Sequence, residues 1–293
     1  RRYLSVQNLK DPVHILKGLH EAKAYMKEHR PDVVFSKGGF VAVPVVMAAH
    51  HYHIPVVIHE SDLSPGLANK LCIPYADKIC YSFPETAKYL THGEPVHTGL
   101  PVRGELLSGS KEAALKFCGF DGTKPVLTVI GGSLGAQHIN EVVEEDLSEL
   151  LKTFDIAHIC GKGKTNPALN GTEGYIEFEY VDKELKDIFA ASDVFISRAG
   201  ANVIYELAAL NKPALLIPLG SKASRGDQIL NAESFRKRGF CDVLMEDDLT
   251  AGSLTEKITA LYNEREKYAA AMEAADMDDA ARAVAEVIAS VVK

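Results

Sequence analysis

The chain has 293 residues, of which 46% are hydrophobic and 25% charged, a composition typical of a globular protein large enough for two domains. Its formal net charge of −8 disfavours nucleic acid as a partner, and no apolar run reaches the ~18 residues needed to span a bilayer. The five cysteines are scattered and form no CxxC pair, which suits a reducing compartment and argues against a structural zinc site.

The first thirty residues are basic, although the chain as a whole is acidic. They hold seven Lys or Arg side chains against three acidic ones, which gives this segment a net charge of +4. A basic, partly apolar segment can lie on an anionic membrane surface, and it can equally form a solvated helix face. The residues by themselves leave both interpretations open.

Short apolar runs alternate with helical patterns from one end of the chain to the other. Such alternation predicts the α/β class, in which parallel sheets are covered by helices. The predicted strands span residues 32–36, 55–59, 78–81, 125–130, 156–160, 175–178, 193–197, 214–217 and 241–244.

One pattern occurs twice, in residues 31–60 and 192–220. Each copy runs from Asp-Val through an apolar strand to Ser, a basic residue, any residue and Gly, and continues with a short helix and a Pro-led strand. The repeat indicates equivalent βαβ units in two similar domains, although two unrelated βαβ units can also resemble each other by chance.

The repeat predicts a domain boundary near residues 97–103, where Gly and Pro mark a connector. We therefore expect an N-terminal domain at 1–100, completed by a C-terminal helix at 277–293, and a second domain at 101–276. The first domain shows roughly half the strands of the second. We therefore also expect that at least one βαβ unit of about 30 residues precedes Arg1.

A glycine-rich turn, Gly131 to Ala136 (GGSLGA), follows the predicted strand 125–130. It matches neither the dinucleotide pattern GxGxxG nor the Walker A pattern GxxxxGK[ST]. Small residues let backbone N–H groups approach an anion, and the N-terminus of the following helix adds partial positive charge. The turn is a candidate phosphate site, although such turns also occur without a ligand.

A second strand-to-helix turn, residues 197–200, leads into a nearly all-apolar helix that carries Glu206. The positions three and four residues away hold no Lys or Arg, so the helix itself offers the carboxylate no ion-pair partner. A carboxylate can accept paired hydrogen bonds from a vicinal diol, the role that acidic residues play on nucleotide riboses. The alternative is a carboxylate on a solvated face or one that interacts with the helix dipole.

Three further polar groups are candidates for a site. Residues 224–232 cluster polar side chains before another helix, which fits either a grip on sugar hydroxyls or a plain capped loop. His59 and Glu60 end the predicted strand 55–59 and are acid/base candidates, or else a hydrogen-bonded structural pair. Asp276 and Asp278 resemble a metal-binding DxD, but at a predicted helix start they indicate an N-cap.

Three motifs together, GGSLGA, SRAGANVIYE and GDQILNA, resemble the MurG family of glycosyltransferases, as do SKGGFVAVPVV, HESDLSPGLANK and HTGLPVR. The resemblance covers essentially the whole chain. It implies a GT-B fold, with two Rossmann-like domains facing across a cleft. It also implies inverting transfer of N-acetylglucosamine from UDP-GlcNAc to the C4 hydroxyl of undecaprenyl-linked N-acetylmuramyl-pentapeptide, which makes lipid II for peptidoglycan. The implied location is the cytoplasmic face of the cell membrane, as a peripheral protein on an anionic surface, with no cofactor and no obligatory metal.

By position, the resemblance places the nucleotide sugar in the second domain. It implies that Arg103 and Ser133 contact the diphosphate, that the backbone of Val181 holds the uracil, and that Glu206 binds the ribose. Gln228, with Asp227, would read the sugar. The implied substrate-binding set is Arg103, Ser133, Leu134, Gly135, Tyr180, Val181, Arg198, Gly200, Ala201, Asn202, Glu206, Asp227, Gln228 and Asn231.

The resemblance does not assign the general base within this numbering. The family's N-terminal glycine-rich loop, with its candidate base histidine, would lie upstream of Arg1, which leaves His59 and Glu60 as weaker candidates. We therefore expect a chain beginning at Arg1 to bind UDP and to show little turnover.

Three other functions compete with this interpretation. The nearest is another GT-B transferase, such as a diacylglycerol glycosyltransferase, which differs in its acceptor. A nicotinamide-dependent oxidoreductase is disfavoured because GxGxxG is absent. A non-catalytic nucleotide-sugar binder would show binding without turnover.

Overall fold

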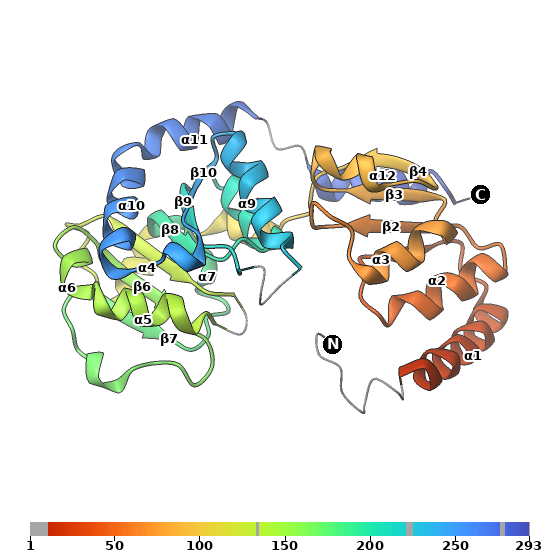
Figure 1. The fold of residues 1–293 in the computed structure, drawn as a ribbon, viewed down its shortest axis with the longest axis horizontal. Coiled ribbons are helices and arrows are strands. Elements are labelled where there is room, and N and C mark those ends of the chain that lie inside the picture. The colour runs from red at the N-terminus through yellow and green to blue at the C-terminus, as the bar shows by residue number, and fades with distance from the viewer. Residues whose placement is uncertain (1–10, 133–134, 221–224, 276–278, 293) are drawn as a thin grey trace. The chain divides into compact units, whose positions relative to one another are not determined.

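The computed structural model describes residues 11–132, 135–220, 225–275 and 279–292. The chain divides into two compact units, each with its own parallel sheet. Unit 1 comprises residues 1–101 and 278–293, and unit 2 comprises residues 102–277. Figure 1 shows the elements of both units. Among the helices in the described residues, none is both long and apolar enough to cross a lipid bilayer.

Unit 1 is built on a four-stranded sheet in which all neighbouring strands are parallel, in the order β1-β2-β3-β4. Its strands are β1 (Val34–Ser36), β2 (Val56–Glu60), β3 (Lys78–Tyr81) and β4 (Glu94–His97). Its helices are α1 (Asp11–His29), α2 (Ala42–His51), α3 (Leu67–Cys72) and α12 (Ala280–Ala289), with short 3-10 helices η2 (Ile73–Tyr75) and η3 (Pro84–Tyr89).

The two faces of the unit 1 sheet are covered by different parts of the chain. On one face, Val56 and Ile58 of β2 belong to a core that includes Val46 of α2 and Met26 of α1. The intervening Val57 points to the opposite face, because successive side chains of a strand alternate between faces. There it packs with Cys80 of β3 and Val284 of α12.

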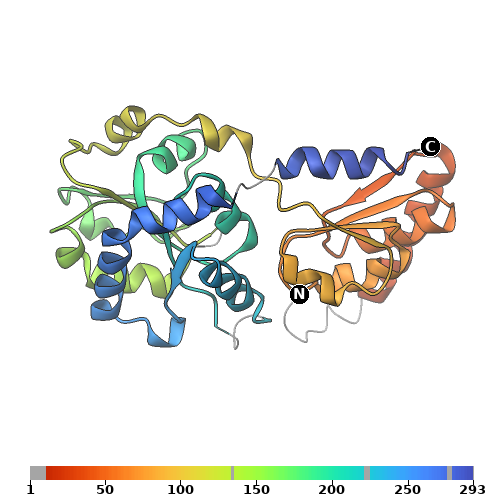
Figure 2. The same cartoon turned by 90° about the horizontal axis from the view of Figure 1, so that it is seen from above.

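Helix α12 reaches this second face from the far end of the chain, and Figure 2 shows it lying along the strands of unit 1. Its apolar stripe recurs at helical spacing and consists of Val284, Val287, Ile288 and Val291. The helix begins after Asp279, whose carboxylate accepts a hydrogen bond from the backbone N–H of Arg282 at 3.0 Å. The cap is therefore Asp279 and neither Asp276 nor Asp278, which lie outside the described residues.

Unit 2 has a six-stranded parallel sheet in the order β10-β9-β8-β5-β6-β7. Its strands are β5 (Val126–Ile130), β6 (Asp155–Ile159), β7 (Tyr175–Phe178), β8 (Ser192–Ser197), β9 (Ala214–Leu216) and β10 (Cys241–Val243). The chain begins in the middle with β5, adds β6 and β7 on one side, and then returns to add β8, β9 and β10 on the other. The strand order therefore reverses between β5 and β8, and open α/β sheets bind ligands at that point, outside the carboxyl ends of the strands.

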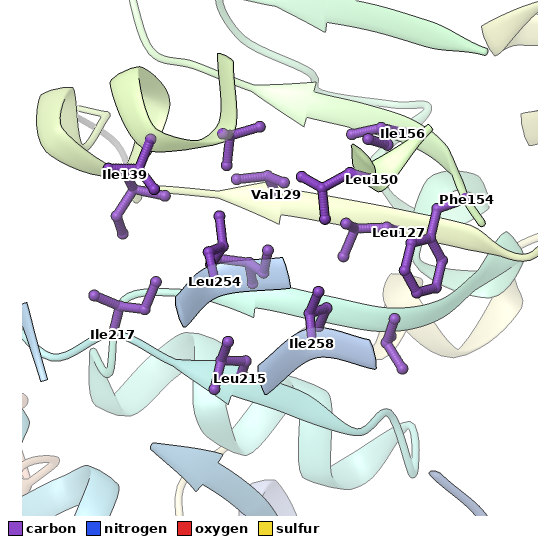
Figure 3. Packing of buried hydrophobic residues seen from close by; sticks show 14 of the residues in the cluster. Leu127, Val129, Ile139, Leu150, Phe154, Ile156, Leu215, Ile217, Leu254 and Ile258 are labelled. Carbon is purple, nitrogen blue, oxygen red and sulfur yellow. The ribbon is translucent and has the colours of Figure 1, made fainter. Parts of the chain in front are cut away.

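Helices cover both faces of this sheet. They are α4 (Lys111–Cys118), α5 (Gln137–Glu145), α6 (Leu147–Leu150), α7 (Leu185–Ala191), α8 (Ala201–Ala209), α9 (Asp227–Lys237), α10 (Ala251–Asn263) and α11 (Arg265–Ala274), with 3-10 helices η4 (Gly104–Ser108), η5 (Pro167–Leu169) and η6 (Glu246–Asp248). Figure 3 shows Ile139 of α5 and Leu254 of α10 meeting Val129 of β5 in one apolar core. On the other face, the ring of Phe195 in β8 lies 4.9 Å from that of Phe189 in α7, edge to face.

Each of the nine predicted strand ranges overlaps a strand of the structure, so the predicted alternation of strands and helices is confirmed. The prediction missed β4, which pairs with β3 at the edge of the unit 1 sheet. Its sequence, Glu-Pro-Val-His, is largely exposed and contains Pro95, which a strand tolerates at a sheet edge. Such a segment has no apolar run from which a strand could be predicted.

Candidate functional site

Three loops leave the carboxyl ends of β5, β8 and β9, next to the point where the strand order reverses. The loop after β8 is tied to the other chain segments by hydrogen bonds. Asn231 of α9 donates from its amide to the carbonyl oxygen of Ala199 at 3.3 Å, and Arg198 donates to the carbonyl oxygen of Ile217 at 3.2 Å. These bonds hold together residues that the sequence separates by 19 to 32 positions.

The loop after β5 requires glycine at two of its positions. A Cβ on Gly131 would collide with the backbone nitrogen of Ala136, and a Cβ on Gly135 would collide with the carbonyl oxygen of Cys160. Gly135 also has a φ of +66° and donates its N–H to the carbonyl oxygen of Gly132 at 2.8 Å. The loop is thus a tight turn directly before α5. Ser133 and Leu134, two of the predicted site residues, lie outside the described residues.

The buried guanidinium of Arg198 is fixed by an acid that our sequence analysis missed. Glu246, in η6 after β10, accepts a hydrogen bond from Arg198 through one carboxylate oxygen. Its other oxygen accepts the backbone N–H of Gly220 at 3.1 Å. Glu246 therefore joins the loop after β8 to the loop after β9. A buried arginine at a strand end requires a counter-charge, and the acidic run Glu246-Asp247-Asp248 after the predicted strand 241–244 was the available signal.

The charge of Glu246 is favoured by these contacts. Burial by itself would raise its pKa, but the hydrogen bonds from Arg198 and Gly220, together with the positive charge of Arg198, outweigh burial and lower it. Glu246 is therefore ionised at neutral pH.

Glu206 has an ion-pair partner, so our interpretation of it as an unpaired carboxylate is wrong. Arg103 donates from Nε to Oε1 at 2.8 Å and from an Nη to Oε2 at 3.2 Å, a bidentate pair. Glu206 is 10% exposed and Arg103 49% exposed. The search for partners within the helix could not find this arginine, because it lies 103 positions away in the sequence. The hydrogen bonds that Arg103 donates to Glu206 raise the pKa of Arg103 above its ordinary value.

The start of α9 presents two polar side chains, Gln228 and Asp227, in different hydrogen-bonding states. The side-chain carbonyl of Gln228 accepts the backbone N–H of Leu219 at 2.9 Å. Asp227 accepts a hydrogen bond from Arg225 through Oδ2 at 3.2 Å. Its Oδ1 is buried and has no hydrogen-bond partner among the described residues. A buried acceptor of this kind usually finds a donor in a ligand or in water.

The remaining predicted residues of unit 2 differ in exposure. Tyr180 is 73% exposed, and Val181 beside it is buried. Gly200 caps α8, Ala201 is buried, and Asn202 is exposed on the first turn of the helix. An exposed aromatic ring beside a buried backbone segment offers a flat apolar surface together with backbone hydrogen-bonding groups.

His59 and Glu60 belong to unit 1, and each is hydrogen-bonded to other groups of that unit. Glu60 accepts the backbone N–H groups of Asp62 and Gly66 and the side-chain amide of Asn69, at 3.0, 3.1 and 2.7 Å. His59 is fully buried and donates from Nε2 to the carbonyl oxygen of Gly99 at 3.0 Å. Burial lowers the pKa of His59 to about 4 and raises that of Glu60. These contacts shape the loop after β2, which is the structural alternative that the sequence left open.

Within the part of the chain that the structure describes, one group of side chains has the chemistry and spacing of metal ligands. It consists of His158, Cys160 and Glu177. The group lies at the ends of β6 and β7, on the other side of β5 from the loops that carry Arg198 and Asp227.

The chain is similar to glycosyltransferases in sequence and in structure. Residues 126–288 match the glycosyltransferase family 28 C-terminal domain, and residues 1–81 match the family's N-terminal domain. A "UDP-N-acetylglucosamine--N-acetylmuramyl-(pentapeptide) pyrophosphoryl-undecaprenol N-acetylglucosamine transferase" of Lachnospira eligens is 54% identical over 95% of this chain and 79% of its own length. The enzyme of that name from Clostridium botulinum (strain Loch Maree) is 52% identical over 98% of this chain and 81% of its own.

Two solved structures share the architecture. The crystal structure of Acinetobacter baumannii MurG matches with a TM-score of 0.75 and 27% identity, over 95% of this chain and 79% of that one. The calicheamicin glycosyltransferase CalG4 matches with a TM-score of 0.66 and 14% identity, over 98% of this chain and 82% of that one, and so informs on the fold. The predicted fold class, two Rossmann-like α/β domains of the GT-B type, is confirmed.

Replacing Glu246 by glutamine should destabilise unit 2 by about 3 kcal/mol, because an amide would set an N–H₂ group against Arg198 or Gly220 and leave the guanidinium without its counter-charge. Since the folded pKa lies below the ordinary value of 4.5, the stabilisation is complete above that pH and is lost as the pH falls through the folded pKa. Urea unfolding of both proteins should therefore show a constant difference near pH 7 that shrinks in acid.

The matched control is Glu233→Gln, which breaks a pair with Arg236 on the exposed face of α9. It should cost less than about 1 kcal/mol. Equal losses in the two variants, or a difference that does not change with pH, would contradict a structural role for Glu246.

Proposed function

Because the chain belongs to the MurG family within glycosyltransferase family 28, we propose that it transfers N-acetylglucosamine from UDP-GlcNAc to undecaprenyl-linked N-acetylmuramyl-pentapeptide. In this reaction the C4 hydroxyl of the acceptor attacks the anomeric carbon, a new glycosidic bond forms with inversion, and UDP leaves. The observation that carries the proposal is the position of the three motifs GGSLGA, SRAGANVIYE and GDQILNA. In the folded chain they follow β5, β8 and β9, at the reversal of strand order.

The departing diphosphate requires positive charge and N–H donors. The backbone of the turn after β5 can approach the diphosphate because Gly131 and Gly135 have no side chains. The turn leads into the N-terminus of α5. Backbone N–H groups and a helix N-terminus stabilise an anion without a metal ion. We assign the diphosphate to this turn, the uracil to the backbone at Val181, and the ribose to Glu206.

Binding of the ribose would exchange partners on Glu206. Both carboxylate oxygens are held by Arg103, and a vicinal diol needs the same two oxygens. Two hydroxyl donors would replace two guanidinium donors and release Arg103 toward the diphosphate. Displacing Arg103 costs little, because its side chain is half exposed and water can solvate it.

The sugar is assigned to the start of α9. Asp227 Oδ1 is a buried acceptor without a partner among the described residues, and a sugar hydroxyl is a donor of the right kind. Gln228 is fixed nearby by the N–H of Leu219. This arrangement supports a grip on hydroxyl groups over a plain capped loop.

We further propose that unit 1 docks on an anionic membrane surface, where a lipid-linked acceptor lies. The first thirty residues carry a net charge of +4. Several large apolar side chains of the same unit are exposed, among them Leu16, Phe40, Val41, Leu67 and Leu71. Basic residues beside exposed apolar ones favour binding to anionic interfaces.

The full-length protein should transfer labelled N-acetylglucosamine from UDP-GlcNAc to the lipid-linked muramyl-pentapeptide and release UDP in equal amount. It should not use diacylglycerol as acceptor, and UDP-glucose should be a poor substitute. Transfer to diacylglycerol would support the alternative transferase. UDP-GlcNAc binding without turnover on any lipid acceptor would leave a nucleotide-sugar binder.

Glu206→Ala should weaken UDP binding by roughly 10- to 100-fold, because two hydrogen bonds to a charged group are lost. The loss is partly offset because the ligand no longer has to displace Arg103. Calorimetric titration with UDP measures this change in affinity. The affinity lost on replacing UDP by 2′-deoxy-UDP should be smaller for the variant than for the wild type. Arg103→Ala makes the opposite test: uridine should bind more tightly and UDP more weakly. Unchanged UDP affinity for Glu206→Ala would remove the ribose assignment.

Charge reversal on α1 should release the protein from anionic vesicles. Each Lys near the surface adds about 1 kcal/mol, so the triple variant Lys17→Glu, Lys23→Glu, Lys27→Glu should lose most binding in a vesicle-sedimentation assay. The control places the same change in unit 2, at the exposed Lys116, Lys152 and Lys183. Equal binding by both variants, or binding insensitive to salt, would contradict docking through α1.

A further inference from the structure

A second polar cluster lies at the carboxyl ends of β6 and β7, and the proposed transfer does not use it. His158 and Cys160 are two positions apart and therefore share a face, as do Tyr175 and Glu177 on the neighbouring strand. The register places His158 directly opposite Glu177. His158 and Cys160 are fully buried.

The orientation of His158 is set by Asn140 of α5. The amide nitrogen of Asn140 donates to the carbonyl oxygen of Cys160 at 3.0 Å, which turns its Oδ1 toward His158 Nε2 at 3.1 Å. Nε2 must then carry the hydrogen, and Nδ1 of the neutral ring presents a lone pair to the cluster. Metal-binding histidines are oriented in this way, with the far ring nitrogen donating to a fixed acceptor.

The Tyr175 hydroxyl lies beside two acceptor atoms but has only one proton to donate. It lies 2.8 Å from His158 Nδ1 and 2.8 Å from Glu177 Oε1. Both atoms are acceptors, and a hydroxyl has one proton to donate. A bound cation, or a second proton on the His158 ring, would satisfy both acceptors.

The surroundings are rich in negative charge. Glu177 and Glu144 are bridged by Asn166, whose backbone and side-chain N–H groups donate to them at 2.7 Å each. A cation would relieve this excess, and a bound metal ion deprotonates a coordinating thiol outright.

We propose that His158 Nδ1, Cys160 Sγ and Glu177 Oε1 bind a zinc ion, with the Tyr175 hydroxyl or a water as the fourth ligand. The three ligand atoms lie within 4.8 Å of one another. In a tetrahedral zinc site they would be separated by ~3.3–3.8 Å, so the side chains need to close by about 1 Å. On binding, the thiol releases its proton to solvent, and the thiolate and carboxylate together balance the charge of Zn²⁺. Imidazole with thiolate and carboxylate favours zinc over magnesium or calcium.

Zinc at this position would stabilise the conformation of the turn after β5. The carbonyl oxygen of Cys160 accepts the amide of Asn140, and it also occupies the space that a side chain on Gly135 would need. The ion would thus hold the end of β6, the first turns of α5 and the glycine-rich turn in one arrangement. With the Tyr175 hydroxyl as fourth ligand the site is structural, since four ligands from protein atoms leave no open position for a substrate.

The test is titration of the chelator-treated, purified chain with Co²⁺, which substitutes for zinc and reports a thiolate ligand by a charge-transfer absorption band. We expect one Co²⁺ per chain with this band, displacement of Co²⁺ by Zn²⁺, and a higher melting temperature with Zn²⁺. Cys160→Ser, a nearly isosteric change, should remove the band and weaken Zn²⁺ binding at least 100-fold. Asn140→Leu should weaken it by about 10- to 100-fold while leaving the band in place.

Cys241→Ser is the matched control, because Cys241 is also a buried cysteine at a strand of the same sheet and lies outside the cluster. It should keep both the band and the Zn²⁺ affinity. The same band in Cys160→Ser, or no Co²⁺ bound at one equivalent, would overturn the proposal. A metal-free protein whose His158 shows both ring nitrogens protonated by ¹⁵N NMR would overturn it too, since a second proton would then satisfy both acceptors.

Discussion

The candidate site depends on the parallel pairing of β5 with β8. This pairing sets Ile130 opposite Ser197, so the glycine-rich turn and the turn that carries Arg198 start at the same level of the sheet. It also creates the reversal of strand order, because β6 and β7 lie on one side of the pair and β9 and β10 on the other. The loops after β5, β8 and β9 leave strand ends at or beside this reversal, whereas Val181, to which we assign the uracil, follows β7 at the edge of the sheet. The proposed site therefore depends on the register of β5 with β8.

Around that pairing, charge is compensated over long sequence distances. Arg198 is neutralised by Glu246, 48 positions away, and Glu206 by Arg103, 103 positions away. Each pair joins two segments that are far apart in the sequence. A buried charge without a partner costs several kcal/mol, so these pairs favour the arrangement in which the two segments meet.

The apolar runs predicted nine strands because a strand buried on both faces needs continuous apolar residues, and β4 was missed because an edge strand does not. The strand ends, and hence the position of the site, follow from the same reasoning. Side-chain partners do not, because helical spacing reveals only neighbours within one turn, and Arg103 lies outside that range of Glu206. The absence of CxxC argued against zinc because that pattern, too, reveals only ligands that are close in the sequence. His158, Cys160 and Glu177 become neighbours only through the register of β6 with β7.

If Glu206 binds the ribose as we propose, its pair with Arg103 would hold the carboxylate before the ligand arrives. A carboxylate that is nearly buried needs a donor at each oxygen, and a planar guanidinium supplies two in the geometry that a vicinal diol also offers. Because Arg103 is half exposed, it can leave at small cost, whereas Arg198 is buried and fixed by Glu246 and cannot. On the proposed ribose assignment the two arginines would have opposite functions: Arg198, held by Glu246, would maintain the shape of the loops, and Arg103 would be displaced from Glu206 by the ligand. A lysine at position 103 would donate to one carboxylate oxygen of Glu206 at a time. The other oxygen would then be desolvated without a hydrogen-bond partner.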